Sequence, residues 1–266
     1  MLSTSLNCPR YSTYDRLVLE VHASRQALGL AAARAAAAFI RDTIALRGEA
    51  RVIFACAPSQ NEFLSCLVDP ARTKVAVDWK AVTSFHMDDY VGLPGTHAQS
   101  FRHYLTTHLL NHIPLGRFYP IEAERADTQA VCTRYADLLS ERPIDLICLG
   151  IGENGHIAFN DPGVADFEDE HLVKPVQLDH ACRQQQVNDG CFPSLEAVPL
   201  TAISLTVPVF RRARRLSIHV PGPRKAKAVA ATLTGTIHPD CPASILRLHP
   251  DATLYVDQDA ASTLGA

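Results

Sequence analysis

Strong charge of either sign and long apolar runs are both missing from this chain of 266 residues, and each absence excludes a class of partner. The formal net charge is only -3, so nothing electrostatic favours nucleic acid or an acidic membrane surface. The longest apolar region, Ala27 to Ile40, is interrupted by Arg34 and is too short to span a bilayer. The N-terminus lacks a basic segment followed by an apolar core, so we expect no secretory signal.

Paired cysteine motifs are missing as well. The eight cysteines include no Cys-x-x-Cys pair. Several of them, such as Cys56 and Cys148, lie inside apolar runs, where a free thiol behaves as a small hydrophobic side chain. We therefore expect neither a disulfide framework nor a zinc cluster, and we predict a cytoplasmic protein that uses no metal.

Helical spacing of apolar residues alternates along the chain with short apolar runs. The pattern predicts helices over 24–48, 61–67, 130–139 and 224–233, and strands over 51–55, 81–85, 144–149, 216–220 and 252–256. Strands separated by helical lengths are typical of α/β proteins. We predict a Rossmann-like fold with a largely parallel sheet and helices on both faces. Because no repeat or linker interrupts the pattern, we expect residues 1–266 to form a single domain.

The first candidate site is the turn Cys-Ala-Pro-Ser-Gln at 56–60, between a strand and a helix. Such a turn exposes backbone N–H groups that can bind an anion. There is no glycine between Gly48 and Gly92, so the turn carries neither a dinucleotide fingerprint nor a Walker loop. That absence counts against NAD and ATP. Ser-Gln also caps helices without binding anything, so both interpretations stay open.

A second candidate is Phe-His-Met-Asp-Asp-Tyr at 85–90, which follows the next strand. Neighbouring side chains of an extended chain point in opposite directions, so one carboxylate should face a ligand while the other orients it. A carboxylate beside a dry pocket suits a general base. A polar turn with Asx hydrogen bonds is the alternative. Metal binding by His86, Asp88 and Asp89 would need further ligands that the sequence does not single out.

The most informative stretch is 150–162, Gly-Ile-Gly-Glu-Asn-Gly-His-Ile-Ala-Phe-Asn-Asp-Pro. Its glycines let the backbone approach a ligand closely. Its polar residues follow the carboxyl end of a strand, where open α/β sheets place their ligands. A polar loop that caps the sheet is the plainer interpretation. His156, with Asp161 close enough in sequence to orient it, favours a catalytic loop.

A basic turn, Gly-Pro-Arg-Lys-Ala-Lys at 222–227, again follows a strand and begins a helix. A lysine at a helix start opposes the helix dipole. Lys225 is therefore better explained if it meets an anion, although a solvated basic turn remains the alternative.

Residues 85–94 and 150–162 together resemble the glucosamine-6-phosphate deaminase (isomerase) family, whose superfamily includes the 6-phosphogluconolactonases. The resemblance extends from the strand at 51 to Tyr255. The lactonase counterpart of the second motif usually reads Gly-His-Thr-Ala-Ser. This chain has Gly-His-Ile-Ala-Phe-Asn at 155–160, which looks like the deaminase branch.

The resemblance implies that a hexosamine 6-phosphate, glucosamine 6-phosphate or an epimer, reacts with water to give a ketohexose 6-phosphate and ammonia. No metal or redox cofactor is implied. Asp88 would move a proton between C2 and C1, and His156 would assist ring opening with acidic partners. The implied phosphate ligands are Ala57, Pro58, Ser59, Gln60, Arg183 and Lys225.

Two alternatives to the deaminase remain, a 6-phosphogluconolactonase-type hydrolase and a non-catalytic sugar-phosphate-binding protein. In each case the expected partner is a small sugar phosphate, with neither nucleic acid nor a membrane. Whether the chain forms a homo-oligomer is left open.

The expected catalytic group is Asp88, Asn154, His156 and Asp161, and two of its members depart from the family pattern. The best-known members carry Asp in place of Asn154 and Glu in place of Asp161. We therefore expect a neutral amide to orient His156, and a carboxylate to act from one methylene further away. A shift of about 1 Å in a catalytic group can cost on the order of 10²-fold in rate. Another epimer, such as galactosamine 6-phosphate, is for this reason a candidate substrate.

Overall fold

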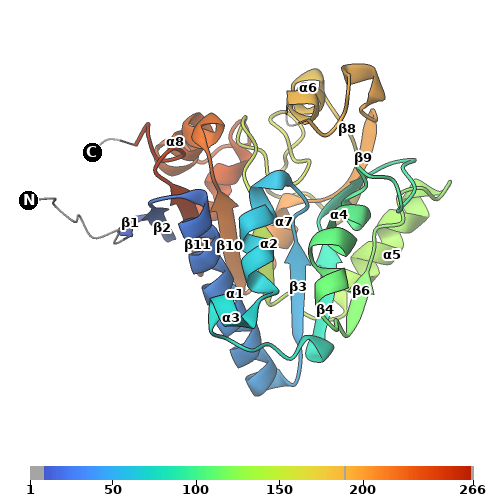
Figure 1. Ribbon diagram of the computed structural model, residues 1–266. Coiled ribbons are helices and arrows are strands. Elements are labelled where there is room, and N and C mark those ends of the chain that lie inside the picture. The colour runs from blue at the N-terminus through green and yellow to red at the C-terminus, as the bar shows by residue number, and fades with distance from the viewer. Residues whose placement is uncertain (1–8, 189, 265–266) are drawn as a thin grey trace, which may run out of the picture.

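The main sheet of the protein has the strand order β1-β2-β11-β10-β7-β3-β4-β6 (Figure 1). The computed structural model describes residues 9–188 and 190–264. The strands are β1 (Arg10–Tyr14), β2 (Leu17–His22), β3 (Ala50–Phe54), β4 (Val82–His86), β6 (Arg117–Tyr119), β7 (Leu146–Leu149), β10 (Arg215–Val220) and β11 (Ala252–Asp257). Strand β1 pairs with β2 in antiparallel fashion, and the other neighbouring strands pair in parallel. The predicted, largely parallel sheet is confirmed.

Helices cover both faces of this sheet, as predicted. They are α1 (Arg25–Arg47), α2 (Asn61–Leu67), α3 (Pro70–Thr73), α4 (Phe101–His108), α5 (Thr128–Ser140), α6 (His180–Asn188), α7 (Val207–Arg212) and α8 (Ala226–Thr234). Side chains of a strand alternate between the two faces. In β3, Val52 and Phe54 accordingly pack in one core with α1, α2 and α4, while Ile53 packs in another with α5, α7 and α8.

Helix α1 illustrates how the sequence determines an element. Ser24 caps the helix, because its hydroxyl accepts a hydrogen bond from the Ala27 N–H at 3.2 Å, and the chain leaves the helix at Gly48. The buried face consists largely of alanine, with Ala32, Ala33, Ala36 and Ala37 in the core. Small side chains let the helix lie close to the sheet. The helix predicted over 24–48 is confirmed.

A second, three-stranded sheet was not predicted from the sequence pattern. It has the order β5-β9-β8 and is antiparallel, with β5 at Asp88–Tyr90, β9 at Thr201–Leu205 and β8 at Val173–Gln177. Strand β5 is too short for a periodic signal. Strand β8 contains Pro175, which is tolerated because β8 is an edge strand. In Figure 1, β8, β9 and α6 lie beyond the carboxyl ends of the central strands.

No described helix combines the length and apolar character that a membrane span requires. The described cysteines are free thiols, and Cys8 lies outside the described residues. Within 9–188 and 190–264, no group of three or more His, Cys, Asp or Glu side chains is arranged to hold a metal ion.

Candidate active site

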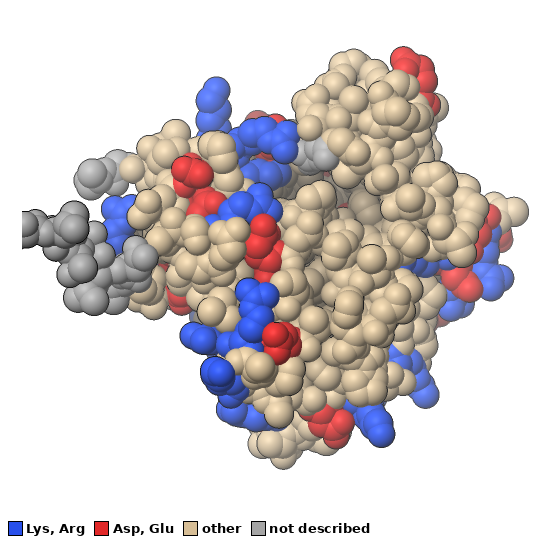
Figure 2. Space-filling model, viewed as in Figure 1, with Lys and Arg blue, Asp and Glu red and all other residues tan. Residues whose placement is uncertain are grey.

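A cavity of about 280 Å³ lies at the carboxyl ends of four parallel strands, β3, β4, β7 and β10. Of the predicted site residues, its lining includes Ala57, Pro58, Ser59, Gln60, Asp88, His156 and Lys225. Segments far apart in the sequence thus meet where open α/β sheets bind ligands. In Figure 2, basic side chains gather beside a hollow between the regions of α8 and α6.

Asp88 is the buried acid of the cavity. It is 6% exposed and begins β5, with a single residue, Met87, between it and the end of β4. Burial, and after it the charge of Asp89, raise the pKa of Asp88 well above its usual value. A carboxyl group with a raised pKa can accept and return a proton near neutral pH more readily than an exposed aspartate.

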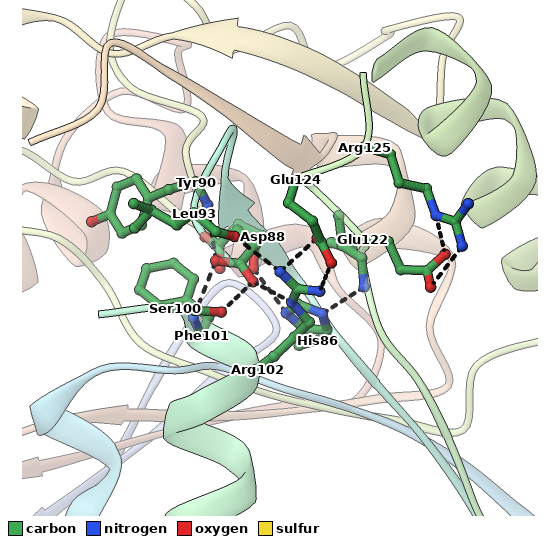
Figure 3. A network of polar contacts seen from close by, with 12 residues as sticks. His86, Asp88, Tyr90, Leu93, Ser100, Phe101, Arg102, Glu122, Glu124 and Arg125 are labelled. Atoms are coloured by element: carbon green, nitrogen blue, oxygen red, sulfur yellow. Dashed lines mark hydrogen bonds and ion pairs between the residues drawn. The ribbon is translucent and has the colours of Figure 1, made fainter. Parts of the chain in front are cut away.

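The neighbouring carboxylate, Asp89, points away from the cavity and anchors β5. It accepts hydrogen bonds from the Ser100 hydroxyl at 3.0 Å, the Phe101 N–H at 3.1 Å and the Arg102 Nε at 3.1 Å. Arg102 also pairs with Glu124 at 2.7 Å. In Figure 3 its guanidinium lies between the strand that carries Asp88 and the Glu124 side chain. Asp88 lines the cavity while Asp89 contacts the protein, as expected for neighbouring side chains of an extended chain.

His86 holds the backbone of Asp88 in place. The His86 Nε2 accepts a hydrogen bond from the Ile121 N–H at 2.8 Å, so the ring proton must be on Nδ1. Nδ1 then donates to the Asp88 carbonyl oxygen at 2.9 Å. Burial lowers the pKa of His86 to about 4, so the ring is neutral. Both ring nitrogens are occupied by the backbone, and His86 is a positioning residue rather than a metal ligand.

His156 lies in the loop after β7 and fits there only because of a glycine. A Cβ atom on Gly152 would overlap the imidazole of His156, so any other residue at position 152 would displace the ring. The ring faces the cavity, and its side chain is 12% exposed. The glycines of this loop were expected to let the backbone approach a ligand closely. Gly152 instead leaves space for the imidazole of His156.

Asp161, rather than Asn154, contacts the imidazole. The His156 Nδ1 lies 2.9 Å from Asp161 Oδ1, in a direction that is not that of a hydrogen bond. The Asn154 amide donates to the same Oδ1 at 2.8 Å and accepts from the His156 backbone N–H at 3.1 Å. Burial raises the pKa of Asp161, but the contacts with His156 and Asn154 outweigh burial and leave the pKa lowered. The expectation that the amide itself orients the ring was wrong, because Asn154 acts through Asp161 and the backbone.

Arg183 is the predicted phosphate ligand that the structure does not bring to the cavity. It belongs to α6, and its guanidinium donates to the carbonyl oxygens of Leu195 and Val198. It does not contribute to the cavity lining. The position of Arg183 therefore does not support the role of phosphate ligand that the family resemblance implies for it.

Arg25 is a cavity residue that the sequence analysis missed. Its Nε and Nη2 donate to the two Glu62 oxygens, both at 3.0 Å, and Nη2 also reaches the Pro58 carbonyl oxygen at 3.3 Å. Arg25 is the first residue of α1. A cation there opposes the helix dipole. The same signal drew attention to Lys225 and could have identified Arg25.

The fold and the site define an α/β protein with a buried acid, a histidine–aspartate pair and a basic wall around one cavity. The sequence matches the family described as glucosamine-6-phosphate isomerases/6-phosphogluconolactonase over residues 23–255, and the chain belongs to this family.

Two curated relatives and two solved structures illustrate the similarity. A glucosamine-6-phosphate deaminase of Lactobacillus delbrueckii subsp. bulgaricus is 37% identical over 188 residues, covering 71% of this chain and 78% of that protein. A glucosamine-6-phosphate deaminase of Listeria monocytogenes is 37% identical over 191 residues, covering 72% of this chain and 80% of that protein. The structure of a monomeric glucosamine-6-phosphate deaminase superposes with a TM-score of 0.83 at 28% identity, covering 92% and 98%. A 6-phosphogluconolactonase of Trypanosoma brucei shares the fold, with a TM-score of 0.76 at 18% identity over 96% and 100%.

Proposed function

We propose that this protein is an aldose–ketose isomerising deaminase that converts a hexosamine 6-phosphate and water to a ketohexose 6-phosphate and ammonia. One observation carries the proposal: Asp88 and His156 face the same cavity, whose wall also contains Lys225. The 37% identity to curated deaminases supports a deaminase over a lactonase, since the lactonase cited above shares only the fold. We further propose that the reaction takes place in the cytoplasm, where the free thiols would stay reduced.

The proposed chemistry uses two proton-transfer groups. His156, polarised by Asp161, assists the opening of the sugar ring by moving a proton at the ring oxygen. Asp88 then removes the proton from C2, which gives an enolamine, and the same carboxyl group returns that proton to C1. Water adds to the resulting C2 imine, and ammonia leaves as the C2 ketone forms. The substrate amine is a cation when protonated, and its approach would favour the ionised form of Asp88.

The phosphate is proposed to lie between the turn at 57–60 and the turn at 222–225. Lys225 and Arg25 supply positive charge, and both line the cavity. The Gly222 N–H donates to both Asp257 oxygens at 3.0 Å, which fixes the second turn. The Arg25 Nη1 lies 3.9 Å from the position of a Cβ on Gly222, so Arg25 joins the two turns. Arg25 therefore takes the part that the resemblance gave to Arg183.

A coupled ammonia assay tests the reaction. Glucosamine, galactosamine and mannosamine 6-phosphates are offered in turn, and hydrolysis of 6-phosphogluconolactone is followed separately. We expect ammonia from at least one hexosamine 6-phosphate and no acceleration of lactone hydrolysis. Lactone hydrolysis without ammonia release would establish the hydrolase instead. Binding without either reaction would establish a sugar-phosphate-binding protein.

Removal of single cations tests the phosphate site. We expect Lys225→Ala and Arg25→Ala each to raise KM by about 10- to 100-fold, because a hydrogen bond to a charged group contributes about 1.5–3 kcal/mol. The value of kcat should change little, since the phosphate does not react.

Arg183→Ala is the matched control for Arg25→Ala, and it should leave KM within about twofold of the wild-type value. A large rise in KM for Arg183→Ala, with none for Arg25→Ala, would restore the assignment that the family resemblance implied.

A further inference from the structure

A buried network of hydrogen-bonded side chains runs from β10 to the turn at 57–60, and none of its inner members takes part in the proposed chemistry. Ser217 and His219 lie in β10, between apolar residues, and both are buried. His219 packs between aromatic rings, with Phe63 at 3.9 Å and Tyr255 at 5.9 Å between ring centroids. Buried polar side chains are costly unless each finds a hydrogen-bond partner. The hydrogen-bond partners of His219 therefore indicate the function of this network.

The direction of each hydrogen bond in this network can be determined. The Gln60 Nε2 lies 3.3 Å from the His219 carbonyl oxygen, which can only accept, so the amide nitrogen must be on that side. The Gln60 Oε1 consequently faces the His219 Nδ1 at 2.7 Å and accepts its proton. The His219 Nε2 is then an acceptor, and the Ser217 hydroxyl donates to it at 2.8 Å.

The network ends at the hydroxyl of Ser59. The Gln60 Nε2 uses its second proton to donate to Ser59 Oγ at 3.1 Å. Gly150 leaves space for this contact, because a Cβ there would lie 3.1 Å from Gln60 Nε2 and 3.3 Å from Ser59 Oγ. Ser59 Oγ therefore acts as an acceptor toward the protein, and its own proton remains to be donated elsewhere. Ser59 lines the cavity.

We propose that Gln60, held by His219 and Ser217, is a positioning residue that fixes the Ser59 hydroxyl as a hydrogen-bond donor to a phosphoryl oxygen. Gln60 is itself not a phosphate ligand, because its amide is engaged on the protein side. This assignment deepens the proposed function and rests on it only for the identity of the substrate. Any tetrahedral oxyanion that enters between the two turns would meet the same donor.

A double-mutant cycle tests the proposal. Ser59→Ala should raise KM for the sugar phosphate about tenfold, and Gln60→Met, which keeps the side-chain volume, about three- to tenfold. In the Ser59→Ala background, Gln60→Met should raise KM less than twofold, because the hydroxyl that it positions is gone. The kcat of each variant should stay within about threefold of wild type. Ser65→Ala, an exposed change on α2, is the matched control and should leave KM unchanged.

Multiplicative effects of Ser59→Ala and Gln60→Met would overturn the proposal, since Gln60 would then act independently of Ser59. His219→Phe, which retains a ring against Phe63, provides the same cycle if Gln60→Met does not fold. Titration calorimetry with inorganic phosphate repeats the cycle without turnover. If no hexosamine phosphate releases ammonia, the proposed function fails. The positioning role fails separately if the effects on the phosphate Kd are multiplicative.

Discussion

Asp88→Asn is expected to abolish deamination while the enzyme continues to bind its substrate. The amide matches the carboxyl group in shape but cannot accept the C2 proton. A general base contributes on the order of 10²–10⁴-fold to a rate, and here the same group both removes and returns the proton, so we expect a loss of kcat at the upper end of that range. Because the interaction exists only in the transition state, substrate Kd should change little. Ammonia release and titration calorimetry measure the two quantities.

Although Asp88→Asn should lose activity, we expect it to keep or increase the stability of the folded protein. The raised pKa of Asp88 means that the folded protein prefers the protonated carboxyl group. Its stabilising contribution is complete below the unfolded-state pKa and is lost as the pH rises through the folded-state pKa. The neutral amide does not undergo this loss. We therefore expect Asp88→Asn to melt at or above the wild-type temperature at neutral pH. A variant that stays folded and binds substrate but keeps the wild-type kcat would refute the catalytic assignment.

The burial of Asp88 also predicts how kcat/KM of the wild-type enzyme falls at acidic pH. In the free enzyme, kcat/KM should fall on acidification with an apparent pKa above that of an exposed aspartate, because Asp88 must be ionised to act.

Much of this site could be predicted from the sequence because its residues lie in four local motifs. Each motif follows an apolar strand, and parallel strands bring their carboxyl ends to one edge. Asp88, His156 and Lys225 were located in this way. Arg25 was missed because it lies far in sequence from the nearest motif, the turn at 56–60, and is brought to the cavity by the position of α1. The second sheet was missed because β5 has only three residues and β8 contains Pro175, so that tertiary pairing with β9 rather than periodicity defines it.

The part played by Asn154 could not be predicted for a related reason. The family resemblance implies a carboxylate at the position of Asn154, but it does not show which side chain contacts the imidazole of His156. The structure shows Asp161 in that position and Asn154 as a donor to Asp161.

Asp161→Asn is expected to lower kcat on the order of 10²–10³-fold by removing the charge that stabilises protonated His156. Because the pKa of Asp161 is lowered in the folded protein, its stabilising contribution is present above its unfolded-state pKa and is lost as the pH falls through the folded-state pKa. The variant should therefore also lose stability at neutral pH. Asp166→Asn, an exposed change in the same loop, is the matched control. Equal losses for both aspartates would contradict a specific role for Asp161.

Asn154→Asp distinguishes two roles for this position. In the first, Asn154 acts as a hydrogen-bond donor to Asp161, and in the second it is a weakened copy of the aspartate that the family resemblance implies. The new carboxylate would replace an amide that now donates to Asp161 at 2.8 Å. Two carboxylates at that distance cannot both be ionised, so one would hold a proton and its pKa would rise. We therefore expect a slower enzyme whose activity recovers as the pH rises. If the variant is faster at neutral pH, Asn154 is a weakened copy of the family's aspartate. The contact between Asp161 and His156 would then not be the one that matters for ring opening.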